Sequence, residues 1–176
     1  MRKIQIWHFR FFRIIFNGLL SGCWFTQQPE SADKGSAPAE LLYSGVYGIS
    51  RLQEASATWI SNHTALSELF KELNERRGGN DGSPPEMDFK SYGVLFLEMG
   101  QKPTGGFSIN FNPSLTRVVG GQLAIHVGWV VPKEGKLVTQ VVTSPFILLK
   151  IMHVNIDSIL VWDQNKTSLF KIPIET

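Results

Sequence analysis

Residues 92–111 read YGVLFLEMGQKPTGGFSINF, and this stretch decides the fold. Its first eight residues are apolar at almost every position, which is typical of a strand buried on both faces of a sheet. Its last five residues, 107–111, alternate instead, with the two phenylalanines and Ile109 directed inward and the polar residues outward. The stretch therefore predicts two strands separated by a short break.

The break itself is rich in residues that interrupt a strand. It contains Lys102, Pro103, Thr104, Gly105 and Gly106. Proline lacks the N–H that a β-ladder needs, and glycine readily adopts positive φ. We therefore expect a tight turn or bulge in which at least one of the two glycines has positive φ. The alternative is functional, because the bare glycine amides could receive a carboxylate or carbonyl group of a partner.

The rest of the pattern predicts one helix and further strands. Apolar residues at helical spacing, Leu66, Leu69, Phe70 and Leu73, predict a helix that starts at Asn62 or Thr64 and ends at Gly78 and Gly79. The remaining strands are expected at 42–49, 56–61, 122–131, 136–142, 145–151, 158–164 and 167–172, the last two as a hairpin. The predicted fold class is α+β, a mostly antiparallel β-sheet with one amphipathic helix packed on it.

The start of the chain has the three-part pattern of a secretory signal. Basic residues are followed by a short apolar stretch, 14–20, and then by small residues before Cys23, the one cysteine of the chain. Leu20-Ser21-Gly22-Cys23 is similar to a bacterial lipobox, so residues 1–22 are expected to be a signal peptide and Cys23 to carry lipid. The alternative is a short hydrophobic anchor with an incidental cysteine.

The segment 23–40 is expected to be a lipidated, flexible tether, because a Pro/Ser/Ala-rich composition cannot bury enough apolar surface to order itself. The folded domain is then 41–176. We therefore expect a lipid-anchored protein of the bacterial cell envelope. In a diderm bacterium the outer membrane is favoured, because the residue after the cysteine is Trp24 rather than aspartate.

The charge distribution argues against a nucleic-acid partner. Four basic residues and no acidic one precede residue 22, and without them 13 basic residues face 15 acidic ones, a formal charge of −2. A domain near neutrality with no basic stripe lacks the electrostatic footprint of nucleic-acid binding.

Two motifs give the chain a family resemblance. The first is the Lys-Pro-Thr-Gly-Gly-aromatic turn ending at Phe107, and the second is Thr139-Gln140 followed by Thr143, Ser144, Pro145 and Phe146. Together with the preceding helix pattern, over about residues 59–152, they make the chain similar to the C-terminal domain of the PrcB family. The segment after His153 departs from that pattern.

The resemblance implies an accessory, non-catalytic lipoprotein of a surface protease complex, with an envelope protease or another envelope protein as partner and the membrane reached through the lipid anchor. The alternative is a peptide- or small-ligand-binding module, or a direct protease inhibitor, that uses the Thr-Gly-Gly turn. Either Thr104, Ser144 and Phe146 line a shared exposed patch, or both motifs are internal. In the internal arrangement Phe107 and Phe146 are buried, and the motif threonines cap backbone amides.

Catalytic and metal chemistry find little support in the sequence. The histidines at 63, 126 and 153 are scattered, and neither metal-ligand spacing nor a nucleophile elbow is present. No enzyme activity, cofactor or metal is therefore expected. Glu98, at the end of the apolar strand, is the acidic residue most in need of explanation if it is buried.

Overall fold

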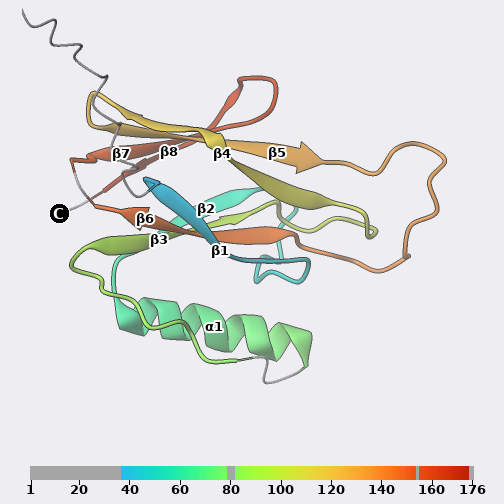
Figure 1. Ribbon diagram of the computed structural model, residues 1–176. Helices are drawn as coiled ribbons and strands as arrows, with labels where there is room; N and C mark the ends of the chain where they lie inside the picture. Colours follow the sequence, from blue (N-terminus) through green and yellow to red (C-terminus); the bar gives the residue numbers. More distant parts are fainter. Residues whose placement is uncertain (1–36, 79–81, 154, 175–176) are drawn as a thin grey trace, which may run out of the picture. The chain divides into compact units, whose positions relative to one another are not determined.

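The computed structural model describes residues 37–78, 82–153 and 155–174, and Cys23 with the expected signal peptide lies outside them. The described residues form one helix and eight strands (Figure 1). Their bounds are β1 Ala39–Gly45, β2 Ser56–Ile60, α1 His63–Arg77, β3 Tyr92–Glu98, β4 Ser108–Val119, β5 Gln122–Val130, β6 Phe146–Met152, β7 Ser158–Trp162 and β8 Ser168–Pro173.

The first sheet has the order β1-β6-β3-β2, and every neighbouring pair is antiparallel. Strand β3 is central, and six of its seven residues are buried. The central position predicted for the apolar run at 92–99 is confirmed, since a strand covered on both faces needs apolar residues on both.

The second sheet has the order β4-β5-β7-β8. Strands β4 and β5, and likewise β7 and β8, are antiparallel hairpin pairs, whereas β5 and β7 run parallel. The predicted hairpin near the C-terminus is therefore confirmed.

The two sheets pack face to face, with α1 on the outer face of the first sheet (Figure 1). Residues from both sheets, among them Leu95, Leu149, Ile125 and Ile159, form the core between them. The α+β class with mostly antiparallel strands is confirmed, but the single sheet predicted is wrong. Alternation shows that one face of a strand is buried and leaves open whether a helix or a second sheet covers it.

The helix begins and ends as its sequence predicts. The side chain of Asn62 accepts a hydrogen bond from the Ala65 N–H at 2.9 Å, and Gly78 ends the helix with φ of 68°. Leu66, Leu69 and Leu73 are buried against the outer face of β3 and β6, where they form a second hydrophobic cluster.

Three segments differ from the sequence prediction. Strand β4 continues to Val119, well beyond the expected end at residue 111. Residues 136–142 are not a strand, because they cross from the second sheet to the first as an irregular loop with several exposed apolar side chains. Ala39 and Glu40, expected in the tether, pair with β6 as the start of β1, which ends at Gly45 rather than at residue 49. At β1 the position of β6, distant in sequence, decides which residues find a ladder partner.

Candidate functional site

The two sequence motifs lie side by side. The backbones of Lys102 and Thr143 exchange two hydrogen bonds, with N···O distances of 2.7 and 3.0 Å. The hydroxyl of Thr143 donates to the Thr104 carbonyl at 2.8 Å, and the Gly105 N–H donates to the Thr139 carbonyl at 2.9 Å. The Thr-Gly-Gly turn is therefore fastened to the segment that precedes β6, and we call this junction the clasp (residues 102–107 and 139–146).

Each of the two glycines in the clasp is required for a different geometric reason. Gly106 has φ of 84°, which confirms the expectation that one of the pair is left-handed. Gly105 is buried, and a Cβ atom there would collide with the hydroxyl of Thr139. Pro103 is exposed at the outside of the turn, where the missing N–H removes no ladder bond. The turn needs these residue types for its shape.

The aromatic residues of the clasp face the interior. Phe146 is 1% exposed and belongs to the cluster beneath α1, where its ring lies 5.6 Å from that of Phe96. Phe107 is half-buried against the core between the sheets. Thr143 and Ser144 are buried as well, whereas Thr104 is half-buried. The hydroxyls of Thr104 and Thr143 donate to backbone carbonyls, rather than capping amides.

A buried carboxylate lies directly beside the clasp. Glu98, at the end of β3, is 1% exposed. Its side chain accepts a hydrogen bond from the Ser144 hydroxyl at 2.7 Å and from the Ser50 N–H at 2.9 and 3.1 Å. Gly48 packs so closely that a Cβ atom there would collide with the carboxylate. Ser144 thus joins the sequence motif to the one buried acid among the described residues.

Burial raises the pKa of the Glu98 carboxyl above its ordinary value, because a charged group loses its hydration there. The hydrogen bonds from Ser144 and Ser50, and the charge of Arg76, act in the opposite direction. Arg76 itself donates to the Ile49 carbonyl at 2.9 Å, which fixes the loop that covers the carboxylate.

A cavity of about 230 Å³ opens next to this carboxylate. Its lining includes Tyr47, Gly48, Ser50, Arg76, Val142 and Ser144. The cavity therefore combines the guanidinium group of Arg76 with several hydroxyl groups and the apolar side chain of Val142, a mixture that suits a small polar ligand or the end of a peptide.

The scattered histidines do not join the clasp. His126 lies on β5 in the second sheet, whereas Ser144 precedes β6 in the first. His63 packs edge-on against Phe89, and the ring of His153 lies 5.5 Å from that of Trp59. In the described part of the chain, no three His, Cys, Asp or Glu side chains gather closely enough to hold a metal ion.

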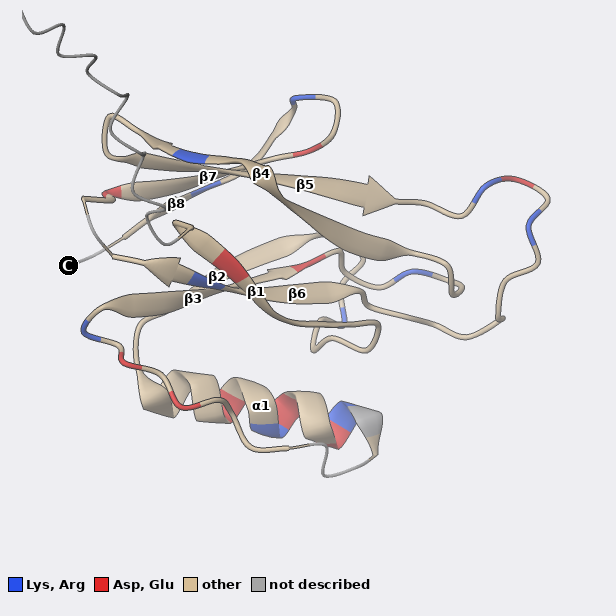
Figure 2. Cartoon of the chain, viewed as in Figure 1, with Lys and Arg blue, Asp and Glu red and all other residues tan. Residues whose placement is uncertain are grey.

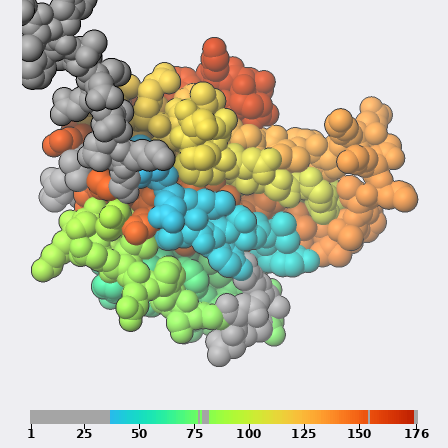
Figure 3. Space-filling model, viewed as in Figure 1, coloured from blue at the N-terminus to red at the C-terminus, as the bar shows by residue number. Residues whose placement is uncertain are grey.

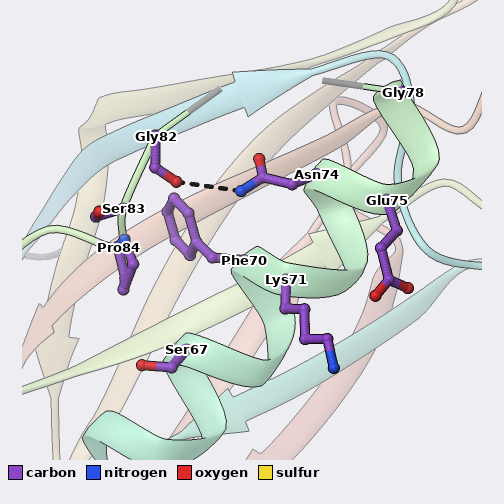
Figure 4. Close-up of a pocket in the computed structure, with 9 residues that line it drawn as sticks. All are labelled: Ser67, Phe70, Lys71, Asn74, Glu75, Gly78, Gly82, Ser83 and Pro84. Atoms are coloured by element: carbon purple, nitrogen blue, oxygen red, sulfur yellow. Dashed lines mark hydrogen bonds between the residues drawn. The ribbon is translucent and has the colours of Figure 1, made fainter. Parts of the chain in front are cut away.

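A larger cavity, about 620 Å³, lies between α1 and residues 82–84 (Figure 4). Phe70 and Asn74 point from the helix towards this segment, and the Asn74 amide donates to the Gly82 carbonyl at 3.1 Å. These contacts hold the segment against the helix, which is a structural role.

The most exposed large apolar side chain of the described residues, Leu137, lies in the loop that leads into the clasp. In this loop, residues 131–142, Leu137 is fully exposed, and Val131, Val141 and Val142 are also exposed. The loop projects from the rest of the described chain (Figures 1 and 3), and its charged residues are Lys133, Glu134 and Lys136 (Figure 2). A projecting loop that leaves apolar residues in water is typical of a surface that another protein covers.

Sequence reasoning identified Ser144 and Glu98 but missed Gly48, Ser50 and Arg76. Ser50 and Glu98 are 48 residues apart, so no local spacing connects them. The only available signal was the glycine at position 48 next to a strand, which indicates a close approach without naming the partner.

Two further findings concern the membrane and relatives. No helix in the described residues has the length and hydropathy needed to span a bilayer. No curated protein and no solved structure matches the chain.

The family comparison bears directly on the clasp. Residues 94–152 match the model of the family described as PrcB C-terminal. The match runs from β3 to the end of β6, so it contains Glu98, both halves of the clasp and the projecting loop. The resemblance seen in the two motifs is thus confirmed over residues 94–152, which are similar to the PrcB C-terminal family.

Proposed function

We propose that this protein is a non-catalytic lipoprotein of the bacterial cell envelope that binds and stabilises a protease as an accessory subunit. The family match supports an accessory role in a protease-related setting. The envelope location, the lipid on Cys23 and the protease as partner are part of the proposal.

The observation that carries the proposal is the projecting loop 131–142. Leu137 is fully exposed and Val131 is 61% exposed, although apolar side chains of this size normally gain from burial. The base of the loop is held by the clasp, where Gly106 packs against Val138 and Pro132. A loop held firmly at its base presents its apolar residues without a large ordering cost on binding.

In this arrangement the motif residues act indirectly. Lys102 to Phe107 and Thr143 to Phe146 fix the loop's ends, and the loop provides the contact. A few residues near the centre of an interface carry most of the binding energy. We assign that part to Leu137, because it is the most exposed large apolar side chain of the described residues.

The test is a membrane pull-down of the partner protease with the Leu137→Asp variant. We expect recovery of the protease to fall at least tenfold with no change in thermal stability, because Leu137 makes no contribution to the core. Val119→Asp is the matched control, since Val119 is equally apolar and 61% exposed but lies on β4. Equal recovery with both variants would contradict the proposal.

A second candidate is a small-ligand or peptide-binding module, favoured by the 230 Å³ cavity beside Glu98. Val142→Trp would fill this cavity and leave Leu137 untouched. Loss of protease recovery with Val142→Trp but not with Leu137→Asp would favour the cavity. A protease whose activity falls when the protein is added would favour direct inhibition.

A further inference from the structure

A third cavity lies on the outer face of the second sheet, away from the core, and has a volume of about 580 Å³. Strands β4 and β5 form its floor, and the loop between β7 and β8 forms one wall. Its polar lining is made of Asn110, Asn112, Arg117, His126, Asp163, Gln164 and Lys166. The β7–β8 loop lies outside the family match, so the cavity combines a family segment with the distinctive C-terminal part of the chain.

The strand register places the polar side chains of the floor on one face. Ile109, Ile125 and Val127 are buried in the core between the sheets. Their neighbours Asn110, Asn112 and His126 therefore point to the opposite face.

Cross-strand pairing brings these outward residues together. Asn112 lies opposite His126, and Asn110 lies opposite Gly128, which leaves the floor open where a side chain would otherwise stand. Within the described residues, the side chains of Asn110, Asn112 and His126 make no hydrogen bond.

The wall of the cavity is held rigidly. The side chain of Gln164 accepts from the Trp129 N–H at 2.9 Å and donates to its carbonyl at 3.5 Å, which extends the ladder between β5 and β7. One oxygen of Asp163 accepts from the N–H groups of Asn165 and Thr167 at 2.8 and 2.7 Å. The loop is therefore formed before any ligand arrives.

Lys166 occupies a backbone position that suits glycine or asparagine. Its φ is 62°, in the left-handed region that most side chains avoid, and its N–H donates to the Asp163 carbonyl at 3.1 Å. A lysine at such a position, with its side chain at a cavity, indicates a use for the charge.

We propose that this cavity binds an acidic oligosaccharide. Amide and imidazole groups both donate and accept hydrogen bonds, which is what vicinal hydroxyl groups require. Arg117 and Lys166, contributed by different elements, supply two positive charges for the acid groups of the sugar. They outnumber the one carboxylate of the lining, Asp163, whose Oδ1 is already occupied by two backbone N–H groups. The volume lies in the range of known ligand sites, about 300–1,000 Å³.

The same structure argues against an acidic peptide. Strand β4 is an edge of its sheet, where a peptide would normally add as a further strand. Pro113 removes a donor from that edge, and the register shifts between Asn112 and Arg117. Such features prevent regular strand addition.

The test uses the full chain, purified from membranes in detergent, and isothermal titration with three probes. These are a hexamer of galacturonic acid, the neutral glucose hexamer maltohexaose, and a hexaglutamate peptide. We expect the acidic sugar to bind at least tenfold more tightly than either of the others, and its affinity to fall as salt is added.

Two variants separate the parts of the site. Lys166→Gly removes the charge and relieves the positive φ, so the acidic sugar should bind about tenfold more weakly while the melting temperature stays equal or rises. Asn112→Ala should weaken both sugars, because it removes hydroxyl recognition. Lys133→Gln is the matched control, since it removes one charge from the loop 131–142 and should leave sugar affinity unchanged.

Equal binding of the neutral and acidic sugars, stronger binding of the peptide, no binding of any sugar, or an equal effect of Lys133→Gln would each overturn the proposal. It is independent of the proposed protease partner, because none of these readouts involves a protease.

Discussion

At the scale of single residues, Glu98 is an ionisable side chain in a position that is closed to water. Its carboxyl is almost fully enclosed, yet only the Ser144 hydroxyl and the backbone near Ser50 donate to it. The raised pKa follows from this enclosure, since protonation removes a charge that the interior solvates poorly. Glu98 therefore makes the stability of the clasp depend on pH.

The first prediction concerns the Glu98→Gln variant. Above the ordinary value of 4.5, the folded state holds the Glu98 proton more tightly than the unfolded state does. The free energy of unfolding of the wild type should therefore fall, relative to that of the variant, as pH rises from about 4.5 through the raised folded pKa. Urea unfolding of both proteins between about pH 4 and pH 8 measures this difference. A difference that is constant, or that grows with pH, would contradict the assignment.

A second prediction concerns Gly48, which lies against the same carboxylate. Gly48→Ala should destabilise the protein by about 1–3 kcal/mol, because its Cβ would collide with Glu98 and lie 2.9 Å from the Ser144 carbonyl oxygen. Gly135→Ala is an informative comparison, since nothing lies near a Cβ there and only its positive φ is unfavourable. Chemical denaturation measures both, and a smaller loss at Gly48 than at Gly135 would contradict the steric explanation.

At the scale of elements, the clasp joins a turn to a loop that has no strand ladder of its own. The Gly105 N–H donates to the Thr139 carbonyl, and the Thr139 hydroxyl occupies the space where a side chain on Gly105 would lie. The Thr-Gly-Gly and Thr-Gln segments therefore fit each other sterically.

The third prediction tests this fit with a double-mutant cycle. Gly105→Ala alone should destabilise the protein by about 1–3 kcal/mol, and Thr139→Ala should relieve most of that loss in the double variant, because it removes the clashing hydroxyl. Chemical denaturation of all four proteins gives the coupling energy. Gly106→Ala combined with Thr139→Ala is the control. The cost of a Cβ at Gly106 comes from its φ of 84° and from Val138 and Pro132 rather than from Thr139, so no rescue is expected there. Additive effects at Gly105 would show that the two segments do not pack as described.

The elements were predictable where local pattern and tertiary context agree. The apolar run of β3, the alternation of β5 and the capped helix each have one consistent interpretation. The segment 136–142 was not predictable, because its valines and Leu137 have strand propensity but find no neighbouring strand. The sequence offered a side-by-side placement of the two motifs as one of two alternatives. The contact of Ser50 with Glu98 depends on a loop closure that no local pattern encodes.

At the scale of the whole molecule, the described domain offers two separate surfaces. The loop 131–142 leads into the clasp at one end of the first sheet, and the proposed sugar site lies on the outer face of the second. A protein with two such surfaces could hold a partner while contacting an acidic polymer, and the lipid proposed on Cys23 would confine both contacts to a membrane surface.

The fourth prediction concerns that lipid. Cys23→Ser should abolish metabolic labelling with a fatty-acid analogue and move the protein from the membrane to the soluble fraction, because each buried CH₂ group of a lipid chain contributes about 0.8 kcal/mol to anchoring. Ser21→Ala, two positions before the cysteine, is the control and should still be labelled. Labelling and membrane recovery that are equal in both variants would refute lipid attachment at this residue.

The pairing of β1 with β6 has a consequence for the time course of folding. Ala39, near the start of the described chain, lies opposite Ile151, and β3 also pairs with β6. Neither β1 nor β3 can therefore complete its ladders until the ribosome has made residues 146–152. Contacts between such distant residues form slowly, because a long loop must close first. The first sheet is therefore completed only after most of the chain has been made. Until then the chain is incompletely folded, and an incompletely folded chain is the form in which a polypeptide is threaded through a translocation channel.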